Sequence, residues 1–121
     1  MARILIVEDS PTEQTALQRL LVQHGHQVWA AVDGNEALKL AQEHRPDLIF
    51  MDVVMPGLNG FQATRELKKT AETADIPVVM ITSKTQDSDK FWGMRQGAKA
   101  YLCKPVSEKD IVDVIHSVLG S

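Results

Sequence analysis

Residues 48–60, LIFMDVVMPGLNG, give the clearest indication of the fold class. Four apolar residues run directly into Asp52, and a loop rich in Pro and Gly follows at once. A short apolar run with these bounds is typical of a strand buried on both faces, as in a parallel sheet. Asp52 should therefore stand at the carboxyl edge of that sheet, where ligands bind in open α/β folds. An aspartate that merely caps the loop is the alternative explanation.

Four further apolar runs are spaced along the chain as strands of the same kind. We expect strands at 3–7, 27–31, 76–82 and 99–103 beside the one that ends at Asp52, and helices whose apolar or terminal positions fall at 17–24, 37–41, 61–68, 87–96 and 111–118. A strand–helix unit repeated five times predicts a parallel sheet with helices on both faces, joined by right-handed crossovers. The expected fold class is α/β, a three-layer sandwich.

Two helix starts carry capping signals. In SPTE, residues 10–13, Ser10 is placed as the N-cap, Pro11 suits the first helical position, and Glu13 would close a capping box. In SEKD, residues 107–110, the same pattern predicts a second box. The helix at 87–96 has the weakest amphipathic pattern of the five, so we expect it to be mobile or to present a surface.

Length and composition restrict the classes of protein to which the chain can belong. Its 121 residues are enough for one domain with one core. A net charge of −3 gives no overall basic field that would favour nucleic acid, and no apolar run approaches the ~20 residues that cross a bilayer. The N-terminus leads directly into a strand, without a signal-peptide layout. The single Cys103 fits a reducing cytoplasm, and we expect it to be a small buried strand residue.

Parallel strands bring their carboxyl ends to one edge of the sheet, so the residues that follow them should meet. The strands deliver, in chain order, Glu8 with Asp9, Asp52, Thr82 with Ser83, and Lys104. Clustered carboxylates repel one another and favour a divalent cation, and Mg²⁺ binds through carboxylates, water and phosphate oxygens. A carboxylate can also accept a phosphoryl group as a nucleophile. A lysine and a hydroxyl would then contact the phosphoryl oxygens.

Each of these residues has a plainer explanation when it is taken alone. Acidic loop residues favour a following helix N-terminus, hydroxyl residues are ordinary in turns, and lysine is usually solvated. Their coincidence at four strand ends of one sheet favours a common site.

With these residues in place, the chain resembles the CheY-like response-regulator receiver domain over essentially its whole length. The resemblance rests on the acidic pair at 8–9, the DVVMPGLNG run at 52–60, the Thr82-Ser83 pair, the GAKAYL run at 97–102, and Lys104-Pro105. It implies the flavodoxin-like strand order 2-1-3-4-5. It also implies that residues 1–121 form a single receiver domain with no effector domain.

The resemblance implies a role for each site residue. Asp52 would be the phosphoacceptor, supplied by the phosphohistidine of a CheA-like sensor histidine kinase. The remaining implied features are Mg²⁺ held by Glu8, Asp9, Asp52 and the backbone carbonyl of Val54, phosphoryl contacts from Lys104, a switch made of Thr82 and Tyr101, and a cis peptide bond between Lys104 and Pro105. From the residues alone, Tyr101 would be expected to be a half-buried strand aromatic with a wet hydroxyl.

Parts of the sequence also resemble single-domain receivers of twitching-motility chemosensory systems, the PilH type. The matching runs are MPGLNGFQATR at 55–65 and WGMRQGAKAYL at 92–102. This resemblance implies a part in type IV pilus twitching motility or taxis. Two residues depart from the family pattern. Glu8 stands where an aspartate is commoner, which changes its reach toward Mg²⁺, and the Val54 side chain cannot direct an attacking water, which bears on the lifetime of the phosphorylated state.

The expected output is a change in partner binding. A phosphoryl group adds about −1.5 to −2 charge and three acceptor oxygens, so the modified state gains contacts that the free state lacks. We expect a cytoplasmic monomer that binds neither nucleic acid nor membrane, and whose fourth helix, fifth strand and fifth helix bind a separate protein. A phosphate sink and a phosphorylation-independent interaction module are alternatives. A phosphohydrolase is disfavoured because Val54 stands where its general acid would be needed.

The remaining aromatic and histidine residues predict no further site. We expect Trp92, on the fourth helix, to be half-buried core, because Trp usually is; an exposed Trp92 would be a candidate partner contact. The histidines are expected on the surface, because no Cys or acid joins them at metal-ligand spacing. They are His24, His26, His44 and His116.

Overall fold

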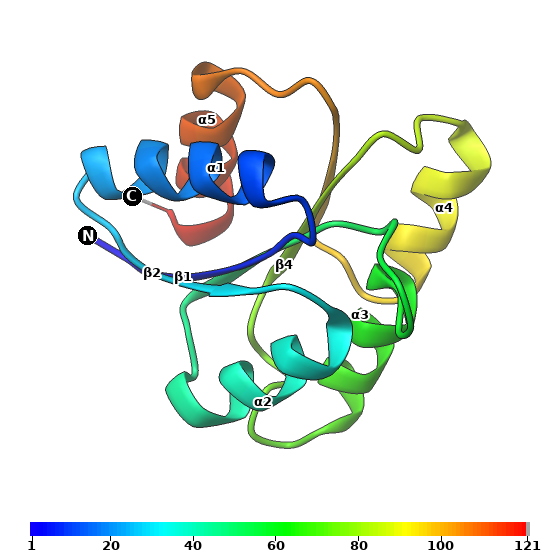
Figure 1. Ribbon diagram of the computed structural model, residues 1–121. Coiled ribbons are helices and arrows are strands. Elements are labelled where there is room, and N and C mark those ends of the chain that lie inside the picture. The colour runs from blue at the N-terminus through cyan, green and yellow to red at the C-terminus, as the bar shows by residue number, and fades with distance from the viewer. Residues whose placement is uncertain (121) are drawn as a thin grey trace.

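Five strands alternate with five helices in the computed structural model, which describes residues 1–120 (Figure 1). The elements are β1 (Arg3–Val7), α1 (Pro11–Gln23), β2 (Gln27–Ala31), α2 (Gly34–His44), β3 (Leu48–Met51), α3 (Gly60–Lys69), β4 (Val78–Thr82), α4 (Asp87–Arg95), β5 (Ala100–Cys103) and α5 (Glu108–Leu119). All sheet pairings are parallel, and the strand order is β2-β1-β3-β4-β5. The predicted α/β class, flavodoxin-like strand order and five-unit repeat are confirmed.

The sheet is the middle of three layers. Strand side chains alternate between its faces: Ile4 and Ile6 pack into the apolar cluster that includes residues of α1 and α5, whereas Leu5 and Val7 pack into the cluster that includes residues of α2 and α3. Figure 1 shows α1 and α5 on one side of the sheet and α2 and α3 on the other. β3 is the central strand and is buried on both faces, which explains why its residues Leu48–Met51 form an unbroken apolar run.

Two strands are shorter than the sequence predicted. β4 begins at Val78 rather than at residue 76, because Pro77 has no N–H to donate to a neighbouring strand. Its carbonyl oxygen still accepts a hydrogen bond from the Ile49 N–H at 3.0 Å. β5 begins at Ala100, one residue later than expected. Asp52 lies directly after β3, so its position at the carboxyl edge is as predicted.

The two predicted capping boxes have different outcomes. The box at the start of α5 is present, with Ser107 and Asp110 each accepting from the other's backbone N–H. At the start of α1 only half of the expected box forms. The Ser10 hydroxyl accepts from the Glu13 N–H at 3.4 Å, but the Ser10 N–H donates to Glu8 Oε2 at 3.0 Å. The Glu13 carboxylate is therefore not a cap and is directed elsewhere.

Helix α4 leaves most of its side chains exposed, as its weak pattern predicted for a surface element. Its one buried residue is Gly93, and its exposed side chains include Phe91 and Trp92, the latter 53% exposed. The expectation that Trp92 would be half-buried core was wrong, because the α4 residue that faces the sheet is a glycine. Cys103 is half-buried rather than buried. Within residues 1–120, no helix combines the length and apolar character that crossing a bilayer requires.

Candidate functional site

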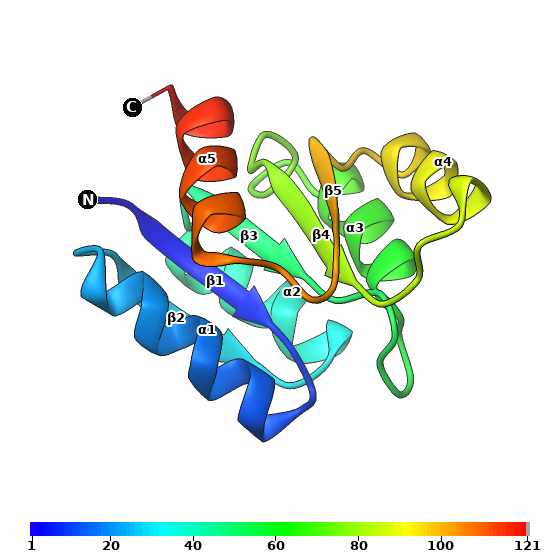
Figure 2. The same cartoon turned by 90° about the horizontal axis from the view of Figure 1, so that it is seen from above.

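The residues predicted to share a site lie at one end of the sheet. Figure 2 shows the loops that follow β1, β3, β4 and β5 together at this end. Parallel register aligns Val7 with Met51, so the residues that follow these two strands are neighbours. Glu8, Asp9 and Asp52 each place one carboxylate oxygen so that the three oxygens lie within 4.8 Å of one another. The predicted acidic cluster is therefore formed by two adjacent residues and a third that lies more than 40 positions further along the chain.

Lys104, which follows β5, joins this cluster through its ammonium group. Its Nζ atom lies 2.8 Å from Glu8 Oε1, 3.0 Å from Asp52 Oδ2 and 3.0 Å from Glu13 Oε1. Burial alone would lower the pKa of Lys104, but the hydrogen bonds to these three carboxylates outweigh it and raise that pKa. Lys104 is thus a fixed cation at the centre of the site. The Lys104-Pro105 peptide bond that follows is cis.

The Glu8 carboxylate is buried and uses both of its oxygens. Its residue is 6% exposed, Oε1 accepts from Lys104, and Oε2 accepts from the Ser10 N–H. Burial raises the pKa of Glu8, the hydrogen bonds from Lys104 and Ser10 lower it in part, and the nearby Asp52 raises it further. The Glu8 side chain, which is longer than the aspartate common at this position, is therefore fixed by hydrogen bonds from Lys104 and Ser10. Asp9, by contrast, is exposed.

Asp52 is also buried, at 6% exposure, and the loop that follows determines how it is presented. Its Oδ1 atom accepts from the Val54 N–H at 3.2 Å, and its Oδ2 atom accepts from Lys104. A Cβ at position 60 would collide with the backbone carbonyl of Asp52, so α3 can begin this close to the site only because residue 60 is glycine. The Val54 side chain is 50% exposed.

Thr82 and Tyr101, the predicted switch pair, are linked through one backbone segment. The buried Thr82 hydroxyl accepts from the Lys84 N–H at 3.2 Å, and the Tyr101 hydroxyl donates to the Lys84 carbonyl at 2.8 Å. Burial raises the pKa of Tyr101 to about 12, with smaller contributions from Asp89, Cys103 and Asp52. Among residues 1–120, no hydrogen bond joins the Thr82 hydroxyl to Asp52. Thr82 and Asp52 thus follow or end neighbouring strands at the same sheet edge without a hydrogen bond between their side chains.

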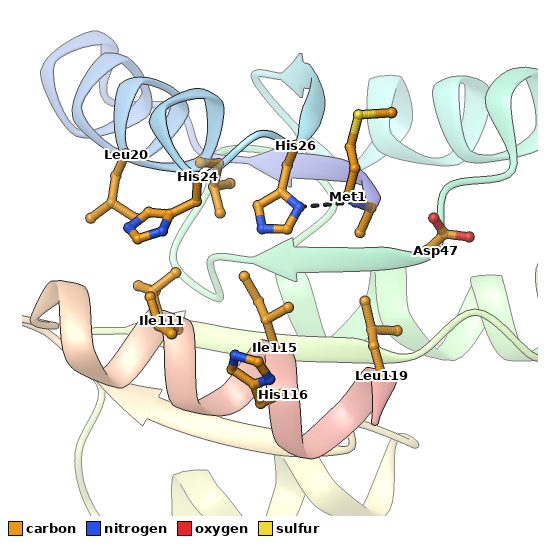
Figure 3. Close-up of a pocket in the computed structure, with 12 residues that line it drawn as sticks. Met1, Leu20, His24, His26, Asp47, Ile111, Ile115, His116 and Leu119 are labelled. Atoms are coloured by element: carbon orange, nitrogen blue, oxygen red, sulfur yellow. Dashed lines mark hydrogen bonds between the residues drawn. The ribbon is translucent and has the colours of Figure 1, made fainter. Parts of the chain in front are cut away.

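A hollow lies between α1 and α5, and none of its lining residues belongs to the acidic cluster (Figure 3). Three of the four histidines line it. His24 Nε2 lies 2.9 Å from Glu108 Oε2, and His26 Nδ1 accepts from the Ala2 N–H at 3.0 Å. Burial lowers the pKa of His26, and the positive charges of the N-terminus and His24 lower it further. The prediction of surface histidines holds for His24 and His116, whereas His26 and His44 are half-buried.

The donor set of the acidic cluster fits Mg²⁺. Three carboxylates converge, carboxylate oxygens are hard ligands, and Mg²⁺ is bound through a few carboxylates with water completing its shell. The exposed Asp9 offers the most accessible oxygens. Glu8 is the departure, because both of its oxygens already accept hydrogen bonds.

The model of the response regulator receiver domain matches residues 4–116. The chain belongs to this family. It is 56% identical to Protein PilH of Pseudomonas aeruginosa over 120 residues, which is 99% of each protein. It is 37% identical to the transcriptional regulatory protein AfsQ1 of Streptomyces coelicolor, and that match covers 98% of this chain and 52% of AfsQ1.

Solved structures agree with the family. The receiver superposes on the chemotaxis protein CheY4 of Vibrio cholerae with a TM-score of 0.92 and 32% identity, covering 98% of each chain. It superposes equally well on the receiver domain of the P. aeruginosa sensor histidine kinase PA1611, at 31% identity and over 99% and 98% of the two chains. That structure has a magnesium ion coordinated in its active site cleft. Receiver domains accept phosphate from histidine kinases, so this chain is a signalling protein and not a catalytic enzyme.

Sequence reasoning missed the partner of Glu13. The SPTE pattern predicted a local cap, yet the carboxylate contacts Lys104, 91 positions further along the chain. A local pattern holds no signal for that contact. The signal available in principle is topological, since the start of α1 and the end of β5 both lie at the carboxyl edge.

Proposed function

We propose that this receiver accepts a phosphoryl group on Asp52 from the phosphohistidine of a CheA-like histidine kinase, and that the modification changes its binding to a partner protein. The observation that carries the proposal is the shared ammonium group of Lys104, which holds the carboxylates of Asp52 and Glu8 together at the sheet edge. A buried carboxylate that is paired with a fixed cation is poised both to attack a phosphoryl group and to have the product's charge compensated.

The transfer is a substitution at phosphorus. A carboxylate oxygen of Asp52 forms the new O–P bond, the N–P bond of the phosphohistidine breaks, and the imidazole leaves with the electron pair of that bond. Lys104 then donates to a phosphoryl oxygen in place of one of its present carboxylate partners. Glu8, Asp9, Asp52 and the backbone carbonyl of Val54 would hold Mg²⁺, which supplies further charge neutralisation when it is bound.

The switch proposed for the phosphorylated state uses Thr82 and Tyr101. A phosphoryl group on Asp52 would provide new acceptor oxygens for the Thr82 hydroxyl, so the Thr82 side chain would turn toward them. The Lys84 N–H donates to the Thr82 hydroxyl, and the Lys84 carbonyl accepts from the Tyr101 hydroxyl. Movement of Thr82 would therefore disturb the hydrogen bond of Tyr101. The proposed output surface is formed by α4, β5 and α5, where exposed Phe91 and Trp92 offer an apolar contact.

The proposed setting is a cytoplasmic chemosensory pathway of the twitching-motility type. The similarity to PilH, which covers nearly all of both proteins, supports this setting.

The experiment is phosphotransfer from a CheA-like kinase carrying labelled phosphohistidine. We expect label to pass to the receiver in the presence of Mg²⁺ and not with a chelator. Asp52→Asn should abolish the transfer, whereas Asp113→Asn, an exposed aspartate on α5, should leave it unchanged. Transfer to the Asp52→Asn variant at the rate of the parent chain would contradict the proposal.

A further inference from the structure

Lys104 has a third carboxylate partner that is neither a candidate metal ligand nor the proposed phosphoacceptor. Glu13 lies in the first turn of α1, and its Oε1 atom is 3.0 Å from the Lys104 Nζ. The expected use of this side chain, closing the α1 capping box, is taken over by Glu8, which accepts from the Ser10 N–H. The Glu13 carboxylate is therefore free of a helix-capping task and pairs with Lys104.

The three carboxylates match the three donors of the ammonium group. A lysine has three N–H groups and no more, and Nζ has one oxygen each of Glu8, Asp52 and Glu13 at 2.8–3.0 Å. With three carboxylate oxygens within 3.0 Å of Nζ, a phosphoryl oxygen has to compete with them for the ammonium group. Under the function proposed above, Lys104 must give up one partner before it can contact the phosphoryl group.

Exposure decides which partner is released. The side chains of Glu8 and Asp52 are 8% and 7% exposed, whereas that of Glu13 is 50% exposed. While a phosphoryl-like anion approaches, Glu8 and Asp52 are both still charged, and removing the cation from either buried carboxylate leaves a poorly solvated charge, whereas a half-exposed carboxylate is taken up by water. The Glu13 contact is therefore the weakest of the three and the one that is exchanged.

We propose that Glu13 is a positioning residue that pairs with the ammonium group of Lys104 in the unmodified receiver and competes with the phosphoryl oxygens for it. This inference rests on the proposed function and adds a property of this chain's own α1. The consequence is a threshold: the anion must displace Glu13, so the site binds phosphoryl-like anions more weakly than Lys104 alone would allow.

The test measures binding of beryllofluoride, a phosphoryl mimic, at saturating Mg²⁺ by titration followed in backbone amide NMR spectra. Glu13→Ala removes the contact, and we expect it to tighten binding about two- to five-fold, the range of one exposed ion pair. Glu13→Asp keeps the charge but shortens the side chain, so it should tighten binding to a similar extent. Glu66→Ala, an exposed glutamate on α3 across the sheet, is the control and should change nothing.

The three variants separate the explanations. If Glu13 merely repels the anion through its charge, Glu13→Asp will behave like the parent chain, and the proposal is overturned. Unchanged or weaker binding by Glu13→Ala also overturns it. If the parent chain itself does not bind beryllofluoride, the proposed function fails, and a parent that binds normally confines the failure to the role of Glu13.

Discussion

The Lys104 Nζ atom lies 3.0 Å from Asp52 Oδ2, although the two residues are 52 positions apart in the chain. The contact depends on β3, β4 and β5 being neighbours in the sheet, because each residue follows the strand that carries it to the carboxyl edge. The contact between Lys104 and Asp52 therefore serves both the stability of the receiver and the proposed phosphoryl transfer. Changes to Lys104 should alter both.

Replacing Lys104 with Met should destabilise the receiver at neutral pH. The substitution leaves Glu8 and Asp52, each 6% exposed, without their cation. We expect a loss of about 1–3 kcal/mol, below the 3–5 kcal/mol of a fully buried pair because Lys104 is partly exposed. Urea unfolding in the presence of a chelator measures it.

The matched control is Lys109→Met on α5, which removes an exposed lysine paired with Asp113. Little change in stability is expected there, because exposed pairs contribute little. Adding Mg²⁺ should recover part of the stability lost by Lys104→Met. Equal unfolding midpoints for the two variants would show that Lys104 is not the cation that holds the acidic cluster.

Gly93→Ala should destabilise α4 even though alanine favours helices. A Cβ at this position would lie 2.8 Å from Met80 Sδ and 2.8 Å from the Tyr101 ring. The overpacking costs about 1–3 kcal/mol, which exceeds the gain of at most ~1 kcal/mol in helix propensity. Denaturant unfolding measures the difference. Ser88→Ala, an exposed position on the same helix, should be neutral or stabilising, and a Gly93→Ala protein as stable as that control would contradict the packing.

Thr64→Val should stabilise the receiver. The Thr64 hydroxyl is fully buried in α3 and has no hydrogen-bond partner among the described residues. A methyl group of nearly the same shape removes that unsatisfied group, and Thr and Val have similar helix propensity. We expect a gain of about 1 kcal/mol in the free energy of unfolding. A loss of stability would indicate that a water molecule or another group satisfies the hydroxyl.

His26 should make stability fall as the pH is lowered. Its Nδ1 atom accepts a hydrogen bond from the Ala2 N–H, and that bond requires an unprotonated Nδ1. Burial lowers the pKa of His26 below 6.5 in the folded state, so the unfolded chain binds more protons as the pH falls through 6.5. The stabilising effect is complete above 6.5 and is lost toward the folded pKa.

The comparison is between the stability–pH profiles of the parent chain and His26→Asn. The parent should lose more stability than the variant below pH 6.5. His116→Asn, at an exposed position, should follow the parent profile. If the parent chain instead gained stability relative to His26→Asn on acidification, the predicted direction of the pH dependence of His26 would be wrong.

The fold and most of the site could be predicted from local patterns, because parallel strands bring the charged and polar side chains that follow them to one edge of the sheet. Asp52 and Lys104 each follow an apolar run, and a parallel sheet brings such residues together. The partner of Glu13 could not be predicted, because a capping pattern and a distant ion pair use the same residue type at the same position. The exposure of Trp92 was missed because burial on α4 is set by Gly93, which fits under the Tyr101 ring.

The most direct test of the central claim is the mass of the intact receiver after incubation with acetyl phosphate and Mg²⁺. We expect addition of one phosphoryl group that depends on Mg²⁺, lies in the peptide that contains Asp52, and is lost in Asp52→Asn. A receiver that takes up no phosphoryl group from several small donors, or one that is modified equally after Asp52→Asn, would contradict it.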